Sequence, residues 1–325
     1  MKNHLAKTLL LILLMTSQHS FALERIPIII DTDANNELDD QHALAYAFFN
    51  QDVFDIKGIT VNHTAVGSIN DDFEEAKRVM QLSGVWGEFP LIEGVDNGTY
   101  EKICDHLKMP EHEGHQAIDF IIQQAHSQGD ERLVIAPIGK LTNVALALEK
   151  DPSIVDKVKI VWLGGNYDGQ DGYDGEHNLM HDASAYNSII LSGADFTMVT
   201  VRYGKPTGSA AVSVDVDEIQ RIMAGLGPKT APVLGRNGGF FSTFGDYSVD
   251  LFSDTSRSSR SLFDLVVFAV LKNPRWGESS LIDAPRLEGD SWNGKFEDLK
   301  IRLVENFNKS EILTDFYESI RSPAP

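Results

Sequence analysis

The sequence predicts an α/β fold, a mostly parallel open sheet flanked by helices on both faces. Two observations predict it. Short apolar, β-branched runs alternate with segments of helical periodicity from Ile26 onward. Repeated strand-then-helix units need right-handed crossovers, which make the sheet mostly parallel and leave helices on both of its faces. Ligands of such folds bind beyond the carboxyl ends of the strands.

Each expected element has a local reason. The first helix carries Ala43, Leu44 and Ala47 on one face, and the second has acids at its start and basic residues later, as the helix dipole favours. A helix after the third strand is stopped by Asp151-Pro152. The third strand is almost continuously apolar, which is typical of a strand buried on both faces. The predicted strands are 26–30, 54–61, 133–138, 159–163 and 195–201, and the predicted helices are 39–50, 71–82, 141–150 and 183–191.

The first residues have the pattern of a secretory signal peptide. Lys2 and Lys7 precede an apolar run, 9–15, and small residues end the segment at Ala22. The run is too short to cross ~30 Å of hydrocarbon. We therefore expect residues 1–22 to be a signal peptide, residues 23–325 to be a single domain, and the mature protein to be periplasmic or secreted without a membrane anchor.

Composition excludes some partners. The net charge of −20 and a pI near 4.8 provide no basic surface for nucleic acid. Cys104 is the single cysteine, so no internal disulfide can form. The segment 236–261 is rich in Gly, Ser and Phe. It is either an active-site lid or an ordinary long surface loop, and the sequence leaves both open.

Acidic residues crowd the loop after the first strand. Asp31, Asp33, Asp39 and Asp40, together with Glu37, lie within ten residues. Such carboxylates repel one another unless a cation neutralises them. Because the loop follows the carboxyl end of a strand, we expect a metal site there.

Three other interpretations of this loop explain less. An EF-hand needs Gly where Asn36 stands and a bidentate Glu where His42 stands. A phosphatase with an aspartyl nucleophile needs Thr or Val at Asn35. A helix cap is a fitting role for Asp39, but it accounts for only one of the acids.

Five motifs, taken together and in order, resemble the inosine-uridine-preferring nucleoside hydrolase family. The resemblance runs from about Ile26 to about Leu271. The motifs are Ile28-Ile-Ile-Asp-Thr-Asp33 with Asp39-Asp40, Ala136-Pro-Ile-Gly-Lys-Leu-Thr-Asn-Val-Ala145, Lys159-Ile-Val-Trp-Leu-Gly-Gly165, Glu176-His-Asn178 with Asp182-Ala183, and Leu262-Phe-Asp264-Leu-Val-Val.

The resemblance implies calcium-dependent hydrolysis of the N-glycosidic bond of ribonucleosides, giving free nucleobase and ribose. It implies a homo-oligomer by analogy. It also assigns roles to individual residues. Ca²⁺ would be held by Asp33, Asp40, Asp264 and the carbonyl of Ile138, with Asp33 as the general base; the ribose would be bound by Asp39, Glu176 and Asn178, with Asn62 as a helper.

The sequence departs from the family pattern in two places. The loop between Asp33 and Asp39 is two residues longer and lacks a Gly, so we expect Asn35 or Asn36 to adopt a left-handed conformation. We also expect Asn35 or Glu37 to reach into the site. Phe263 stands where many members carry a His that protonates the leaving base.

Another group must therefore assist the leaving base. The candidate histidines are His42, His63, His112, His115, His177 and His181, of which His112 and His115 are favoured by their place before a helix. An aromatic platform is the alternative, formed by Phe240, Phe241, Phe244 and Tyr247, although aromatic clusters more often belong to the core.

Two other functions stay open from the sequence. One is hydrolysis of a different ribosyl compound, which the two departures favour. The other is an exported nucleoside- or sugar-binding protein without turnover, since Glu176 and Asn178 suit a binder equally well. Asp33 and Asp264, which a binder does not require, favour chemistry.

Overall fold

The computed structural model describes residues 25–253 and 257–323. The predicted signal peptide, 1–22, lies outside the described residues. Within the described ranges, no helix is long and apolar enough to span a membrane.

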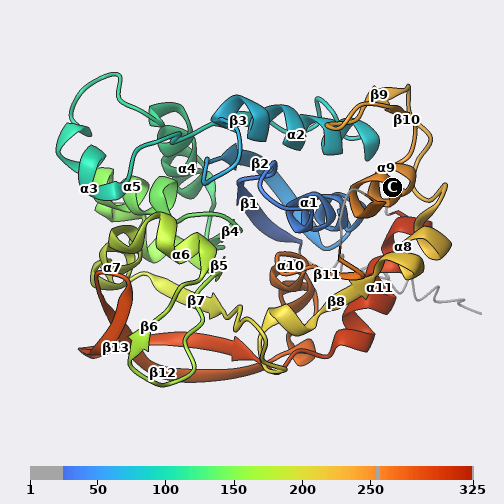
Figure 1. Ribbon diagram of the computed structural model, residues 1–325. Coiled ribbons are helices and arrows are strands. Elements are labelled where there is room, and N and C mark those ends of the chain that lie inside the picture. Colours follow the sequence, from blue (N-terminus) through green and yellow to red (C-terminus); the bar gives the residue numbers. More distant parts are fainter. Residues whose placement is uncertain (1–24, 254–256, 324–325) are drawn as a thin grey trace, which may run out of the picture.

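A large sheet forms the centre of the fold (Figure 1). In the described part of the chain it has nine strands, in the order β12-β13-β7-β5-β4-β1-β2-β3, with β6 paired to β13. All neighbours from β13 to β3 are parallel, and β12 and β6 run antiparallel to β13. The mostly parallel sheet is therefore confirmed. The strands are β1 (Ile26–Thr32), β2 (Phe54–Val61), β3 (Leu91–Glu93), β4 (Leu133–Pro137), β5 (Val158–Leu163), β6 (Gly172–Tyr173), β7 (Asp195–Val199), β12 (Glu278–Glu288) and β13 (Ser291–Glu305).

Helices cover both faces of this sheet. Ile28 and Ile30 of β1 join one buried apolar cluster and Ile29 joins the other, because successive strand residues point to opposite faces. Figure 1 shows α1 and α10 on one side and α4, α5 and α7 on the other. The helices are α1 (Asp39–Phe49), α2 (Ile69–Leu82), α3 (Tyr100–Ile103), α4 (His115–Ser127), α5 (Thr142–Lys150), α6 (His177–His181), α7 (Ala183–Ser192), α8 (Val216–Met223), α9 (Phe244–Ser253), α10 (Leu265–Lys272) and α11 (Lys309–Arg321).

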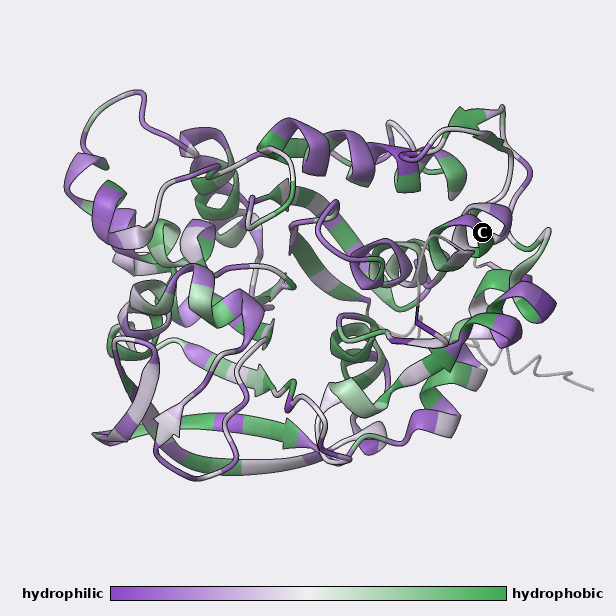
Figure 2. Ribbon diagram, in the orientation of Figure 1, coloured by the Kyte–Doolittle hydropathy of each residue, from purple (hydrophilic) through white to green (hydrophobic). Residues whose placement is uncertain are grey.

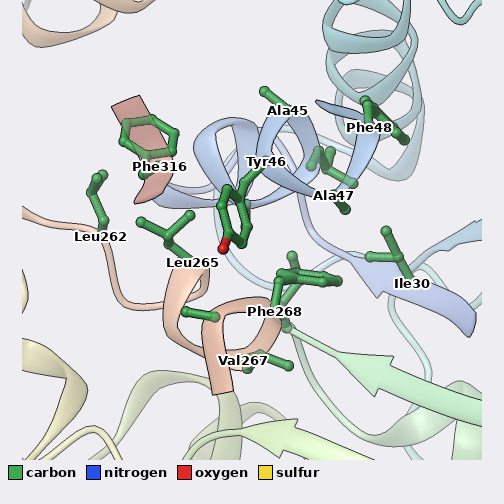
Figure 3. Packing of buried hydrophobic residues seen from close by; sticks show 14 of the residues in the cluster. Ile30, Ala45, Tyr46, Ala47, Phe48, Leu262, Leu265, Val267, Phe268 and Phe316 are labelled. Atoms are coloured by element: carbon green, nitrogen blue, oxygen red, sulfur yellow. The ribbon is translucent and has the colours of Figure 1, made fainter. Parts of the chain in front are cut away.

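The core on the α1 side packs α1 against α10 and α11. Tyr46 of α1 packs near Phe268 of α10 and Phe316 of α11 (Figure 3). Phe268 also meets Phe54 of β2 edge to face, with ring centroids 6.0 Å apart. Removing such a buried ring typically costs about 3–5 kcal/mol. Since the core clamps both helices, the residues at the first turns of α1 and α10 are held rigidly.

The segment 236–261 is not a long loop without secondary structure. It holds α9 and the short strands β10 (Phe240–Phe241) and β11 (Ser259–Ser261), which pair with β9 (Val233–Leu234) and β8 (Ser213–Asp215). Phe244, Tyr247 and Leu251 of α9 are buried. Their helical spacing is the physical reason, although the surrounding Gly and Ser obscure it in the sequence.

Hydropathy follows the layers. In Figure 2 the strands at the middle of the sheet are mostly green, whereas outer helices such as α2 alternate green and purple. Short 3₁₀ turns complete the described elements, at Cys104–His106, Pro152–Lys157, Ser209–Ala211 and Pro274–Trp276.

Candidate active site

A cavity of about 490 Å³ lies beyond the carboxyl ends of the central strands. It collects residues that follow β1, β2, β4, β5 and β7, as expected for a parallel sheet. A larger surface hollow of about 870 Å³ lies beside α5 and α7, but no predicted site residue lines it. The smaller cavity is lined by Asp33, Asn36, Glu37, Asp39, Asp40, Ala65, Val66, Ile138, Leu163, Glu176, His177, Asn178, Val201, Tyr203, Arg257, Phe263 and Asp264.

Three carboxylates meet in this cavity. One oxygen each of Asp39, Asp40 and Asp264 lies within 4.8 Å of the other two. Asp39 and Asp40 are the first residues of α1, and Asp264 directly precedes α10. Asp39 does not cap α1, because Leu38 occupies the cap position and no side chain caps it. The clamped first turns of the two helices therefore bring together acids from opposite ends of the chain.

The charges of these acids are strongly coupled. Burial raises the pKa of Asp39 to about 6, and it raises the pKa of Asp40 and Asp264 well above the usual range, with neighbouring carboxylates adding to both. Thr32 donates a hydrogen bond to Asp40 at 2.6 Å, which favours the ionised form. Buried like charges need protons or a cation. An all-oxygen donor set fits a hard metal ion.

Asp33 lies in the same cavity but outside the group of three. It is 1% exposed and accepts a hydrogen bond from the Thr64 hydroxyl. Burial raises the pKa of Asp33 to about 7, whereas the Thr64 hydrogen bond lowers it. Behind it is Gly139, where an added Cβ would lie 2.7 Å from Asp33 Oδ1 and from Asn62 Oδ1. The backbone therefore approaches Asp33 so closely that no side chain fits.

Glu176 and Asn178 occupy the wall of the cavity on α6. Glu176 caps that helix, accepting from the amides of Asn178 and Leu179 at 3.0 Å and of Gly165 at 2.9 Å. Burial raises the pKa of Glu176 to about 7 despite these hydrogen bonds. Asn178 donates to the carbonyl oxygens of Ile138 at 3.0 Å and Leu163 at 3.1 Å. Both side chains are thus fixed before any ligand binds.

Asn62 and Asp31 lie behind the cavity rather than on its wall. Asn62 donates to Asp31 at 2.9 Å, and Thr60 and Asn143 donate to the same carboxylate at 2.6 and 2.7 Å. Burial nevertheless raises the pKa of Asp31 to about 6. The Asn62 Oδ1 is buried without a hydrogen-bond partner among the described residues. Asp31 is therefore a support, and the substrate contact of Asn62 stays a prediction.

Comparison with known proteins decides the family. The family model described as "Inosine-uridine preferring nucleoside hydrolase" matches residues 28–310. The chain belongs to that family.

Curated relatives match part of the chain. An inosine-uridine preferring nucleoside hydrolase of Leishmania major is 29% identical over 191 residues, 53% of this chain and 59% of that protein. A non-specific ribonucleoside hydrolase of Klebsiella pneumoniae is 26% identical over 191 residues, 54% of this chain and 60% of that protein. The chain thus matches about three fifths of the length of these relatives.

Solved structures confirm the nucleoside hydrolase fold. The plant nucleoside hydrolase PpNRh1 superposes with a TM-score of 0.71 at 19% identity, covering 92% of this chain and 100% of that one. An inosine-guanosine nucleoside hydrolase reaches a TM-score of 0.69 at 17% identity, covering 91% and 99%.

The loop that is longer than the family pattern is held by its own contacts. Asn35 donates from its backbone to Asp72 at 2.9 Å, and Glu37 pairs with Arg260. The expected left-handed residue is wrong, because neither Asn35 nor Asn36 has a positive φ. The side-chain contacts let the loop close without it. As expected, Glu37 reaches the cavity wall, but Asn35 does not.

The histidines separate clearly. Among the histidines of the described residues, His177 alone lines the cavity. His42 is buried between Leu38 and Ser248, and His63 binds Asp72 at 2.6 Å. His181, one turn after His177, is also absent from the cavity wall. His112 lines a different hollow, with His115 bonded to its carbonyl oxygen, so the preference for this pair is not supported.

The remaining wall residues also differ from the sequence expectations. Phe263 lines the cavity and meets Tyr203 edge-on at 5.8 Å. Phe244 and Tyr247 are core residues, so they form no platform for a base. Thr64 and Tyr203 were missed, although both closely follow strands and the carboxyl-end rule points to them.

Proposed function

We propose that this protein is a calcium-dependent nucleoside N-ribohydrolase that converts a ribonucleoside to free nucleobase and ribose. One observation carries the proposal: the group of Asp39, Asp40 and Asp264 lies beside Asp33 in a cavity beyond the strand ends. The names of the family and of its relatives point to ribonucleosides. A cavity of about 490 Å³ is also in the usual range for a small-molecule site.

The residues present fit a calcium ion. Asp33, Asp40, Asp264 and the carbonyl of Ile138 would hold it, and all of them line the cavity. Carboxylate and carbonyl oxygens are the ligands that calcium prefers, and thiol or imidazole donors are absent from this set. When bound, the ion supplies positive charge that polarises the ribose hydroxyls and the attacking water.

The protein's own groups carry the other parts of the reaction. Asp33 accepts the proton of the attacking water, whose oxygen bonds to C1′ while the electron pair of the N-glycosidic bond leaves with the nucleobase. Asp39, Glu176 and Asn178 would hold the ribose hydroxyls, with Asn62 as a helper. The surrounding carboxylates stabilise the positive charge that develops on the sugar.

A second candidate is hydrolysis of a different ribosyl compound. Asn36, His177 and Phe263 form a cavity wall that departs from the family pattern, which is where a nucleobase would be recognised. We also propose that residues 1–22 direct the protein to the periplasm or outside the cell, that residues 23–325 form one domain, and that this domain forms a homo-oligomer.

Product analysis tests the proposed function. Purified protein is mixed with inosine, uridine, adenosine and cytidine in the presence of calcium, and free ribose and nucleobase are quantified. We expect both products in equal amounts and a loss of turnover in Asp33→Asn. Asp119→Asn is a matched control, because that carboxylate lies on the exposed side of α4 and pairs with Lys150. Tight nucleoside binding without ribose release would instead indicate a binding protein.

A further inference from the structure

Two side chains that depart from the family pattern contact each other on the cavity wall. Asn36 Nδ2 lies 2.8 Å from His177 Nε2, and both residues line the cavity. Asn36 belongs to the lengthened loop, and His177 stands where the family motif carries Phe. The lengthened loop thus places the Asn36 amide beside the His177 imidazole. The Phe of the family motif has no such hydrogen-bonding group.

The hydrogen-bond network gives this pair a defined polarity. Thr64 Oγ1 lies 3.3 Å from His177 Nε2, but its one hydroxyl hydrogen is donated to Asp33. Thr64 therefore donates nothing to the imidazole, and the donor that faces Nε2 is the Asn36 amide. Nε2 then accepts this hydrogen bond, so the ring hydrogen lies on Nδ1, which is left to donate to a ligand.

The other polar side chains on the wall include Arg257 and Tyr203 besides the carboxylates, whereas Phe263 and Leu163 are apolar. Burial lowers the pKa of His177 to about 4, with the neighbouring His181 contributing, so its ring is neutral at pH 7. A neutral imidazole matches a nucleobase edge, which presents both donors and acceptors.

We propose that His177, oriented by Asn36, hydrogen-bonds the departing nucleobase and sets which bases this enzyme accepts. This inference rests on the proposed function. As the N-glycosidic bond breaks, its electron pair leaves negative charge on the ring nitrogens of the base. A hydrogen bond from the pair stabilises that charge more than it stabilises the bound nucleoside, so its main effect falls on kcat rather than on KM.

Two substrates with different leaving groups test the proposal. A nucleoside needs help to release its base, whereas p-nitrophenyl riboside releases an anion that is stable in water. His177→Phe keeps an aromatic ring and removes the hydrogen bond. We expect it to lower kcat for the best nucleoside by about 10- to 100-fold, with a much smaller loss for the aryl riboside. His177→Gln keeps a donor and an acceptor and should recover part of the rate.

Controls separate recognition from folding. His181→Phe changes the ring that contacts His177 at a tilt, with 4.3 Å between centroids, but does not change the cavity wall, so both substrates should react as in the wild type. Asn36→Ala should reproduce the substrate-dependent loss in weaker form. Calcium affinity and melting temperature are measured for every variant.

The outcomes are distinct. Equal losses on both substrates in His177→Phe, or no loss on either, would overturn the assignment of His177. If the wild type hydrolysed neither substrate, the proposed function itself would be overturned.

Discussion

The side-chain amide of Asn178 donates a hydrogen bond of 3.0 Å to the carbonyl oxygen of Ile138. The same amide donates to Leu163 at 3.1 Å, so one side chain joins the last residues of β5 to the residue after β4. Because the Ile138 carbonyl is a proposed calcium ligand, the hydrogen bond from Asn178 would orient that ligand. Such supporting contacts commonly change metal affinity by about 10- to 100-fold.

Asn178→Asp should weaken calcium binding by at least about tenfold, because the substitution turns an oxygen toward two carbonyl oxygens. We also expect a loss of about 1–3 kcal/mol in the free energy of unfolding. Isothermal titration with calcium and chemical unfolding measure the two effects. Asn187→Asp is the matched control: Asn187 bonds the backbone of Leu287 away from the cavity, so its loss should lower stability alone. Unchanged calcium affinity in Asn178→Asp would contradict the orienting role.

The stability of the calcium-free protein should fall as the pH rises from about 4 to about 7. Burial raises the pKa of Asp31 to about 6 and of Asp33 and Glu176 to about 7. In the unfolded chain these carboxyls titrate near about 4. Between these pKa values the folded state therefore binds more protons than the unfolded state. The stabilisation that these carboxyls give the folded state is complete below their pKa in the unfolded chain, and it is lost as the pH rises through their pKa in the folded protein.

Calcium should reverse this trend, because it neutralises the same carboxylates without protons. The calcium-induced rise in melting temperature should therefore be larger at pH 8 than at pH 5. Thermal scans with calcium and with a chelator measure it. A rise of equal size at both pH values would be inconsistent with the coupled charges of this site.

Gly139→Ala should inactivate the enzyme more than it unfolds it. The added Cβ would lie 2.7 Å from Asp33 Oδ1, so the proposed base must move. Overpacking of this kind costs about 1–3 kcal/mol. Activity and chemical unfolding are compared with those of Gly129→Ala, where an added Cβ meets nothing within 4 Å. Full activity in Gly139→Ala would show that the position of Asp33 is not critical.

Thr64→Val should shift the acidic limb of the kcat/KM profile to higher pH. The Thr64 hydroxyl lowers the pKa of Asp33, so its removal leaves burial as the dominant influence and raises that pKa further. Thr64→Ser keeps the hydroxyl and should retain the wild-type profile. If the limb does not move in Thr64→Val, then the titrating base is not Asp33.

Most of the sheet was predictable because its strands are short, apolar and bounded by clear stops. The expected limits of β2 match those observed, and α5 ends at Lys150 beside Asp151-Pro152 as predicted. The antiparallel pair β12 and β13 was not predicted. β12 is the edge strand and β13 lies next to it, and in both strands the exposed and buried positions do not form a continuous apolar run.

The site was predictable only in part, since distant residues meet through tertiary packing. The charges of the acidic loop alone indicated a cation site. Asp264 was assigned to that site only from the resemblance to the family, and its carboxylate does lie with those of Asp39 and Asp40. The contact between Asn36 and His177 has no local signal, because it depends on how the lengthened loop closes. Thr64 was missed although it closely follows β2, so the rule that ligands bind beyond strand ends could have found it.

Calcium reconstitution is the decisive experiment for the proposed enzyme. Chelator-treated protein is titrated with calcium while ribose release from the best nucleoside and bound calcium are both followed. We predict that activity rises in parallel with bound calcium, and that Asp264→Asn loses both together. Full ribose release in excess chelator, with no calcium bound, would contradict the account.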